Sequence, residues 1–386
     1  MNSMFKAFEN IYNHNDMIRV FFSPGRVNII GEHIDYNGGL VFPAAISIGT
    51  YGAIRSRTDH VIRLYSSQFV DQGIVYTDLN NLSYHQKDGW ANYAKGILNL
   101  LKKRGYEISF GFDLYIEGNL PTASGLSSSA SLEVLVAYIA NELYNLKLSR
   151  IDLALLAQEV ENDYMGMHCG IMDQLIIACG IKDKALLMNT ATLEMETSNA
   201  IFPHYQWVIM NTNYQRKTTE SKYNERVYEC NLGLEILKEK YDIKYLCELN
   251  VSDLPDVRKM IEDGIIYQRV KHAVTEQDRT IQSKDMMAKG DVLGFARLLN
   301  ESHQSLKADY QVTGFHLDTL VEAALNHGAI GARVTGAGFG GCAIALVESK
   351  KVLSFRQQVS QIYKDLTGLD AQFYEVTFEN GVHEVK

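Results

Sequence analysis

Residues 331–342 read GARVTGAGFGGC, and this stretch decides between two fold classes. Gly336, Gly338 and Gly341 satisfy the pattern G-x-G-x-x-G after a strand-like run, as in a dinucleotide-binding fold, where the pattern opens a helix. Residues 342–347, CAIALV, are instead a short uncharged apolar run typical of a buried strand. We therefore reject the dinucleotide interpretation. The glycines predict either a tight connection between two strands or a loop that closely approaches another backbone or a ligand.

Strands and helices alternate along the rest of the chain without the regular spacing of βαβ units. The predicted elements are strands at 18–22, 110–116, 185–188, 206–210, 332–335, 342–347 and 372–376, a helix-rich stretch at 220–327 and a helix at 350–366. This order predicts an α+β fold rather than a doubly wound sheet. Because the pattern changes near residue 205 and no linker is visible, we expect two closely joined domains, residues 1–200 and 201–386.

Two local patterns specify elements of the first half in more detail. Every second residue from Phe110 to Ile116 is apolar, which predicts a half-buried strand. Ser149 followed three residues later by Asp152 resembles a capping box and predicts a helix that ends near Gly166.

The composition is that of a folded globular protein. Of its 386 residues, 46% are hydrophobic and 22% are charged, which argues against a disordered or coiled-coil chain. The formal net charge of −9 argues against nucleic acid as a partner, although local basic groups and backbone N–H groups can still bind an anionic small ligand. Five cysteines without a C-x-x-C pair, no signal peptide and no long apolar stretch predict a cytoplasmic protein with reduced thiols and no membrane partner.

The segment 24–39, PGRVNIIGEHIDYNGG, places polar residues within an apolar stretch. A buried polar group without a partner costs about 1–3 kcal/mol, so these groups must be paired or used. The polar residues are Arg26, Asn28, Glu32, His33 and Asp35. They predict a functional site. A surface loop with an ion pair between Arg26 and Glu32 is the alternative, and a metal site is a third interpretation, although the spacing is not that of standard ligands.

The segment 121–131, PTASGLSSSAS, follows a predicted strand and precedes a helical pattern. Small residues let a backbone close around an anion, and the next helix offers free N–H groups with a partial positive charge. The segment therefore predicts a phosphate cradle whose hydroxyls can also reach a magnesium ion. The alternative is a serine-rich N-cap without a ligand.

Taken together, the three segments resemble the GHMP family of small-molecule kinases, and segment 24–39 is similar to the galactokinase signature. The P-loop and protein-kinase motifs are absent from the sequence. Further matching segments lie at 161–164, 166–174, 221–226 and 302–310, so the resemblance covers nearly the whole chain. It implies a two-domain GHMP kinase fold, with a mixed α/β N-terminal domain, a ferredoxin-like C-terminal domain and the active site between them.

The resemblance also implies an activity and partners. The activity is ATP-dependent phosphorylation of D-galactose at its C1 hydroxyl, the first committed step of galactose catabolism. Galactose and ATP are the implied partners, Mg²⁺ is the implied cofactor and a monomer is the expected state.

Roles are carried over residue by residue from the same resemblance. Asp173 is the implied catalytic base and Arg26 the cation beside it. Such a pair is chemically sensible, because a nearby guanidinium favours the charged form of a carboxylate that must accept a hydroxyl proton. The implied sugar ligands are Glu32, His33, Asp35, Gly170 and Tyr223. The implied ATP-binding residues are Gly125, Leu126, Ser127, Ser128 and Ser129, and the implied magnesium ligands are Ser129 and Glu161.

Two positions depart from the family pattern. Ala123 stands where the phosphate loop usually has Gly, which predicts a slightly reshaped loop if that position needs a positive φ. Ile34 stands where most galactokinases have Thr, and relatives acting on N-acetylgalactosamine resemble this variant. A kinase of N-acetylgalactosamine or another hexose is therefore one alternative. A catalytically silent sugar and ATP sensor that binds a regulatory protein is the other.

Overall fold

The structure is a computed structural model that describes residues 2–121, 125–167, 169–214 and 219–385. Ala123 and its expected effect on the phosphate loop lie outside the described residues.

The first half is built on a six-stranded sheet with the order β13-β1-β3-β6-β4-β5. All neighbouring strands are antiparallel except β4 and β6, which are parallel. The strands are β1 (Arg19–Asn28), β3 (Pro43–Ser56), β4 (Val61–Ser66), β5 (Val75–Asp78), β6 (Phe112–Gly118) and β13 (His383–Glu384). The strand predicted at 18–22 is confirmed and continues to Asn28, so the segment with Arg26 is part of the sheet.

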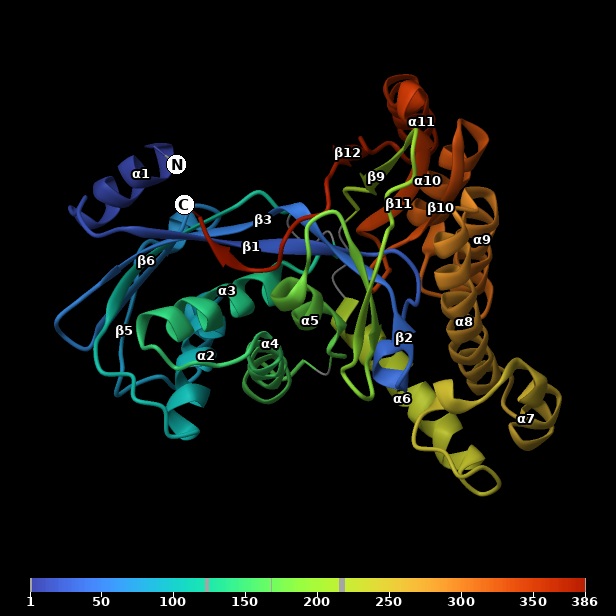
Figure 1. Cartoon of the computed structure of the whole chain (residues 1–386), viewed down its shortest axis with the longest axis horizontal. Helices are drawn as coiled ribbons and strands as arrows, with labels where there is room; N and C mark the ends of the chain where they lie inside the picture. Colours follow the sequence, from blue (N-terminus) through green and yellow to red (C-terminus); the bar gives the residue numbers. More distant parts are fainter. Residues whose placement is uncertain (1, 122–124, 168, 215–218, 386) are drawn as a thin grey trace.

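Helices cover both faces of this sheet (Figure 1). On one face lie α2 (Ala91–Lys103), α3 (Ser128–Leu143), α4 (Arg150–Glu159) and α5 (Met172–Cys179). On the other lies α1 (Asn2–Tyr12), which packs in a small apolar cluster with Tyr115 of β6.

The prediction of a half-buried strand at 110–116 is therefore wrong. Both faces of β6 are buried between Phe112 and Ile116. Tyr115 packs against α1. Asp113 can lie in this buried strand because its charge is paired with Arg63, whose Nε is 2.6 Å from Oδ1 of Asp113.

The predicted capping box at the start of α4 is confirmed. The side chain of Ser149 accepts the N–H of Asp152, and the side chain of Asp152 accepts the N–H of Ser149. The helix then continues into a π-helical turn, Val160–Tyr164, which ends shortly before Gly166. Single π-helical turns are rare and are often found at functional sites.

A small three-stranded sheet with the order β2-β7-β8 leads towards the second half. Its strands are β2 (Leu40–Val41), β7 (Ala185–Asn189) and β8 (Met195–Ser198), and β7 confirms the strand predicted at 185–188. The remaining short helical turns of the chain are Asp35–Asn37, Val70–Gln72, Gln86–Asp88, Leu246–Glu248, Val251–Asp253 and Ser349–Lys351.

The second half contains an antiparallel four-stranded sheet with the order β10-β11-β9-β12. Its strands are β9 (Tyr205–Asn211), β10 (Ala329–Val334), β11 (Cys342–Glu348) and β12 (Gln372–Glu375). Its helices are α6 (Thr219–Leu237), α7 (Leu254–Met260), α8 (Gly264–Lys289), α9 (Val292–Ala308), α10 (Gly314–Asn326) and α11 (Val352–Thr367). Because β11 follows the glycine-rich loop directly, the rejection of a dinucleotide fold is confirmed. The strand order is that of a ferredoxin-like sheet, and the α+β class is confirmed.

The two halves are joined by packing as well as by the chain. One apolar cluster includes Val27 and Phe42 from the first half together with Trp207, Phe295 and Ile344 from the second. The C-terminal strand β13 also returns to pair with β1, and the two termini lie near each other (Figure 1). A boundary near residue 200 remains our proposal.

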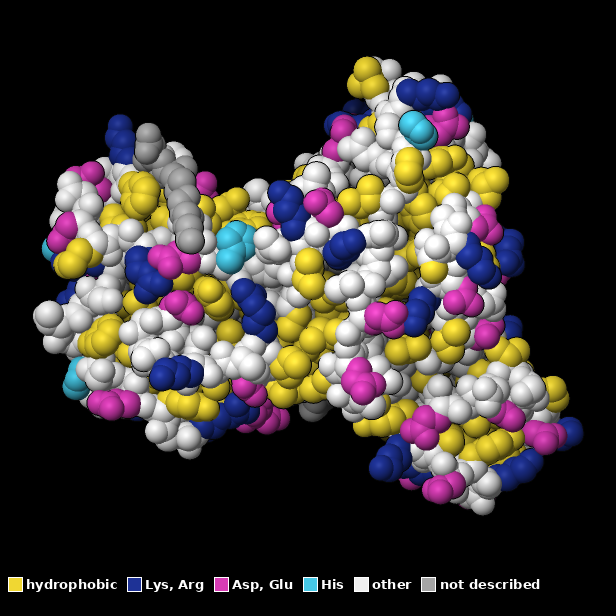
Figure 2. All heavy atoms as spheres, viewed as in Figure 1, with side chains coloured by type: hydrophobic (Ala, Val, Ile, Leu, Met, Phe, Trp, Pro, Cys, Tyr) yellow, Lys and Arg dark blue, Asp and Glu magenta, His cyan; other side chains and the backbone are white. Residues whose placement is uncertain are grey.

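Charged side chains of both signs are intermingled on the face shown in Figure 2. Within the described residues, no helix combines the length and the apolar character needed to cross a membrane.

Candidate active site

A cavity of about 270 Å³ is lined by residues from both halves of the chain. Every predicted site residue except Leu126 lines it: Arg26, Glu32, His33, Asp35, Gly125, Ser127, Ser128, Ser129, Glu161, Gly170, Asp173 and Tyr223. The side chain of Leu126 is buried in an apolar cluster, and its carbonyl accepts the N–H of Arg26 at 3.3 Å. Leu126 therefore supports the turn rather than facing the cavity.

Arg26 and Asp173 meet across the cavity in a two-point ion pair. Nε and Nη2 of Arg26 each lie 2.7 Å from an oxygen of Asp173, and Nη1 donates to the carbonyl of Gly125 at 2.6 Å. The register of β1 against β3 shifts between Pro24 and Gly25, and such a bulge re-aims the side chain that follows. Asp173 lies in the first turn of α5. The arrangement fixes the orientation of the Asp173 carboxylate. It leaves the side chain of Asp173 partly accessible, with an exposed fraction of 27%.

The alternative of a surface loop with a local pair between Arg26 and Glu32 is wrong. Both side chains are buried, and Glu32 pairs with Arg333 of β10 at 2.5 Å instead. Burial raises the pKa of Glu32, although Arg333 and Arg26 act in the opposite direction.

His33 and Tyr223 form one wall of the cavity. His33 has a φ of +61° and lies with its ring 5.7 Å from that of Tyr223. Nε2 of His33 lies 3.2 Å from the carbonyl of Ala337, so this nitrogen is the donor, and Nδ1 accepts from the hydroxyl of Tyr36 at 2.8 Å. Burial lowers the pKa of His33 to about 3 and raises that of Tyr223 well above its ordinary value. Both groups are therefore neutral at pH 7.

Asp35 and Gly170 are in close contact at the same end of the cavity. A Cβ atom on Gly170 would lie 1.9 Å from Oδ2 of Asp35, so only glycine leaves this carboxylate in place. Burial, together with the charges of Asp173 and Glu32, raises the pKa of Asp35 to about 7. Its charge therefore changes within the physiological range.

The serine turn before α3 lines the same cavity. Ser127 is the N-cap residue, with a φ of +64°, and its side chain makes no capping hydrogen bond. Its hydroxyl donates to Asp173 instead. Ser127 is thus an N-cap residue whose side chain does not cap the helix, and the alternative of a serine-rich N-cap without a ligand stays open. The helix start keeps backbone donors and a partial positive charge for an anion.

Ser129 and Glu161 supply neighbouring oxygen atoms at the edge of the cavity. The hydroxyl of Ser129 donates to Oε1 of Glu161 at 2.8 Å, and Nε2 of Gln174 donates to Oε2 at 2.6 Å. Burial raises the pKa of Glu161, so a cation at this point would favour its charged form. In the part of the chain that the structure describes, no three His, Cys, Asp or Glu residues are grouped to hold a metal. Two protein oxygens suit Mg²⁺, which keeps several waters and binds substrate phosphates.

The glycine-rich loop of residues 336–341 closes the cavity from the second half. Gly336 has a φ of +78°, and a Cβ there would lie 2.5 Å from the carbonyl of Gly125 in the serine turn. The close approach of this loop to another backbone is therefore confirmed.

Sequence reasoning missed a second cavity of about 150 Å³ beside the serine turn. It shares Ser128 and Ser129 with the first cavity, and its aromatic wall includes Phe69 and Trp90, stacked with a centroid distance of 6.4 Å. Among the described residues, Nε1 of Trp90 has no hydrogen-bond partner. No signal in the sequence separates such lining residues from core residues.

Ile34 does not line the cavity that Glu32, His33 and Asp35 line. Its side chain is fully buried in the main apolar core. The departure from Thr at this position therefore changes core packing rather than the cavity wall.

Three parts of the chain match known families. Residues 6–56 match the galactokinase galactose-binding signature, residues 92–181 the GHMP kinases N terminal domain and residues 284–365 the GHMP kinases C terminal domain. A galactokinase of Ligilactobacillus salivarius is 48% identical over 362 residues, 94% of each chain. One from Staphylococcus carnosus is 44% identical over the full length of both chains.

Solved structures are similar over the same length. The crystal structure of Lactococcus lactis galactokinase complexed with galactose superposes with a TM-score of 0.97, at 44% identity, over 100% of this chain and 99% of that one. The mevalonate kinase of Methanococcus jannaschii has a TM-score of 0.65 at 21% identity over 95% of this chain and 100% of its own, which is a likeness of fold alone.

Proposed function

This chain belongs to the galactokinase family of GHMP kinases, and from this premise we propose that it transfers the terminal phosphoryl group of ATP to the C1 hydroxyl of D-galactose. The observation that carries the proposal is the two-point ion pair between Arg26 and Asp173, which faces the serine turn across one cavity.

Asp173 is the catalytic base in this proposal. Phosphoryl transfer is catalysed mostly by positioning and charge stabilisation, so the base need only orient the attacking hydroxyl and accept its proton. The two hydrogen bonds from Arg26 hold both carboxylate oxygens of Asp173 in one plane. Arg26 thereby limits Asp173 to orientations in which it faces the cavity.

The sugar binds at the end of the cavity formed by Glu32, His33, Asp35, Gly170 and Tyr223. Carboxylates accept hydrogen bonds from sugar hydroxyls, and a site built from such acceptors rejects sugars whose hydroxyls point elsewhere. The galactose held by the Lactococcus lactis relative supports galactose as the sugar.

The phosphates of ATP bind at the start of α3, on Gly125, Ser127, Ser128 and Ser129. The neighbouring cavity lined by Phe69 and Trp90 receives the adenine ring, because it opens on the same serines and offers a flat aromatic wall.

Magnesium is held by Ser129 and Glu161, whose oxygens meet at 2.8 Å beside the proposed phosphate site. When bound, the ion neutralises charge on the phosphates during transfer. The residues of the chain contribute the two oxygen ligands, and Gln174 fixes the carboxylate of Glu161 through its amide.

We further propose that the protein acts in the cytoplasm as a monomer. All cysteines of the described chain are free, which suits a reducing compartment. The proposed sugar, phosphate and metal ligands all come from one chain.

The Asp173→Asn variant tests the role of the base. We expect kcat for formation of sugar phosphate to fall by about 10²-fold or more, because the amide cannot accept the hydroxyl proton. The matched control is Asp163→Asn, which changes an exposed carboxyl group. A near-normal rate in a folded Asp173→Asn protein contradicts the mechanism.

A panel of hexoses separates the remaining alternatives. We expect the highest kcat/KM for galactose, with a lower value for N-acetylgalactosamine. A higher value for N-acetylgalactosamine would replace the sugar assignment and keep the reaction. Absence of any sugar phosphate with ATP and magnesium, despite sugar binding, would favour the sensor.

A further inference from the structure

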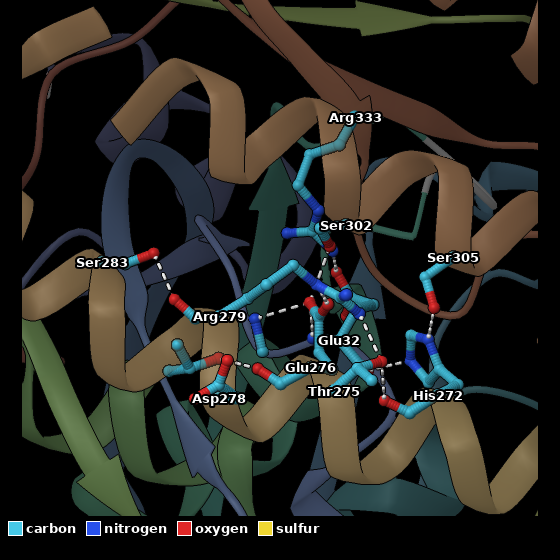
Figure 3. Close-up of polar contacts among 12 residues, drawn as sticks. Glu32, His272, Thr275, Glu276, Asp278, Arg279, Ser283, Ser302, Ser305 and Arg333 are labelled. Atoms are coloured by element: carbon cyan, nitrogen blue, oxygen red, sulfur yellow. Dashed lines mark hydrogen bonds and ion pairs between the residues drawn. The ribbon is translucent and has the colours of Figure 1, made fainter. Parts of the chain in front are cut away.

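Glu276 of α8 is a fully buried carboxylate that lies close to Glu32 (Figure 3) and is not among the residues that line the cavity. Its Oε1 atom accepts the backbone N–H of Gly31 at 3.1 Å and that of Glu32 at 3.2 Å. The same oxygen accepts the hydroxyl of Ser302 at 2.6 Å, and Oε2 accepts from Nε of Arg279 at 2.8 Å. One side chain of the second half therefore holds two consecutive backbone donors of the first half.

The charge of Glu276 suits this role. Burial alone would raise its pKa, but Arg279, His272 and Arg333 outweigh burial and lower the pKa to about 2. The group is thus a carboxylate at neutral pH. Only the ionised form can accept from all four donors without presenting a proton of its own.

Gly31 and Glu32, whose N–H groups Glu276 accepts, lie outside the strands of the described residues, directly after Ile29 and Ile30, which are bonded to the backbone of Phe42. The strand β1 ends at Asn28, and Gly31 has a φ of +92°, a conformation that favours glycine. A Cβ at Gly31 would also lie 2.7 Å from the carbonyl of Leu40. The path of the chain into Glu32 therefore depends on side chains that reach it from elsewhere.

Two other groups of the second half hold the same loop (Figure 3). His272, one turn before Glu276 on α8, has Nε2 at 3.0 Å from the carbonyl of Glu32. Because a carbonyl only accepts, Nε2 carries the proton, and Nδ1 accepts from the hydroxyl of Ser305 at 2.9 Å. Arg333 binds the carboxylate of Glu32. The N–H, the carbonyl and the side chain of Glu32 are thus each held by a different residue.

We propose that Glu276 is a positioning residue for sugar recognition: by binding the N–H groups of Gly31 and Glu32 it sets the direction in which Glu32 and His33 meet the sugar. This inference rests on the proposed function, in which those two residues bind galactose. The serine turn has no hydrogen bond to Glu276 among those of the described residues. Loss of Glu276 therefore affects sugar binding more than nucleotide binding.

The variant Glu276→Gln keeps the size of the side chain and removes its charge. The variant Glu276→Asp keeps the charge opposite Arg279 and withdraws the carboxylate by one methylene, so it tests the same contact if the first variant fails to fold. In each, we expect the Kd for galactose, measured by calorimetry without nucleotide, to rise about 10-fold or more. The KM for galactose should rise in parallel, and the KM for ATP should stay within about 2-fold.

Ser302→Ala is the matched control, because it removes one donor to Glu276 and leaves both backbone contacts. We expect its galactose affinity to stay within about 2-fold of wild type. A merely structural role of Glu276 predicts that the KM values for galactose and ATP rise together as the melting temperature falls, and that result overturns the inference. Unchanged galactose binding in both Glu276 variants of an active enzyme also overturns it. A wild-type protein that does not phosphorylate galactose overturns the proposed function and this inference with it.

Discussion

The loop of residues 28–35 and the serine turn of residues 125–129 face each other across one cavity, and they are held in opposite ways. In the loop, the carbonyls of Asn28 and Ile29 accept from Arg333, and Glu32 is bonded to three side chains of the second half. In the turn, the N-cap residue Ser127 leaves the helix start without a side-chain cap. The loop of residues 28–35 is thus held by hydrogen bonds within the protein, whereas the serine turn keeps N–H donors for a ligand.

The difference matches the chemistry of the two proposed substrates. A sugar is neutral and is identified by the directions of its hydroxyls, so its site gains from acceptors held in fixed positions. A triphosphate is a strong anion, so its site gains from free N–H groups and a helix dipole. Changes behind the loop should therefore alter stability and sugar recognition, and changes beside the turn should alter nucleotide binding.

Arg333→Met should have the largest effect on stability. It leaves the buried carboxylate of Glu32 without its ion-pair partner and the carbonyl of Ile29 without the Arg333 donor, while the carbonyl of Asn28 keeps only the hydroxyl of Thr335 at 3.1 Å. We expect the free energy of unfolding, measured with urea, to fall by about 3–5 kcal/mol. Arg356→Met, which breaks an exposed pair with Glu375, should cost less than about 1 kcal/mol. Equal costs for the two variants would contradict the view that the loop is held by buried charge.

Gly170→Ala should impair sugar use without affecting the nucleotide. The new Cβ displaces the carboxylate of Asp35, so we expect kcat/KM for galactose to fall about 10- to 100-fold. The KM for ATP should remain near the wild-type value. Gly264→Ala serves as the control, because a Cβ at that position meets no atom within 4 Å. A fall in ATP affinity of the same size would show that the two regions are not separable here.

Trp90→Leu should weaken the use of ATP and leave galactose binding unchanged. Removing the aromatic wall of the smaller cavity is expected to raise the KM for ATP about 10-fold, since stacking of a base on an aromatic ring contributes about 1–3 kcal/mol. The Kd for galactose should stay unchanged in calorimetry. The control, Tyr76→Leu, removes an exposed aromatic ring elsewhere. An unchanged KM for ATP would show that adenine does not bind in this cavity.

The pH dependence of activity should be an effect of about the same size as that of Trp90→Leu. Asp35 has a pKa raised to about 7, so it is protonated below that pH. If its carboxylate binds a sugar hydroxyl, kcat/KM for galactose falls about 10-fold between pH 8 and pH 6. Asp35→Asn should have lower activity and lack this limb of the profile, and an unaltered profile in that variant would assign the titration to another group.

The free energy of unfolding should fall as the pH rises, whereas the activity should increase. Because the folded state raises the pKa of Asp35 above its ordinary 3.8, protonation favours folding. This contribution is fully present below about pH 4 and is lost as the pH rises through about 7. Chemical denaturation of ligand-free protein at pH 8 should therefore find Asp35→Asn more stable than wild type.

Local patterns predicted much of the fold. The capping box at Ser149, the strand β7 and the strand after the glycine-rich loop follow from the spacing of apolar residues and from helix-end chemistry, which act over a few residues. The same rules gave the wrong burial for β6, because period-two alternation cannot show that α1 covers its second face or that Asp113 has a buried partner.

The family resemblance predicted the pair Arg26 and Asp173, but the residues alone did not show which other site residues pair. Arg333 stands between Ala332 and Val334 of a predicted strand, and an arginine between apolar residues needs a partner for its charge if that strand is buried. That partner is Glu32, 301 residues away in the sequence. The aromatic wall of the smaller cavity gave no signal at all, since Phe69 and Trp90 are as apolar as core residues.

The sequence by itself determined which chemical groups are present: a carboxylate-rich loop, a serine turn before a helix and a glycine-rich connection between strands. It did so because periodicity, capping and glycine conformation are local properties. The family resemblance placed Arg26 beside Asp173, but the other long-range contacts came from the tertiary structure alone: Arg333 binds Glu32 across 301 residues, and Glu276 reaches back 244 residues to Glu32. Such contacts arise from the packing of whole elements, which no short stretch of sequence encodes.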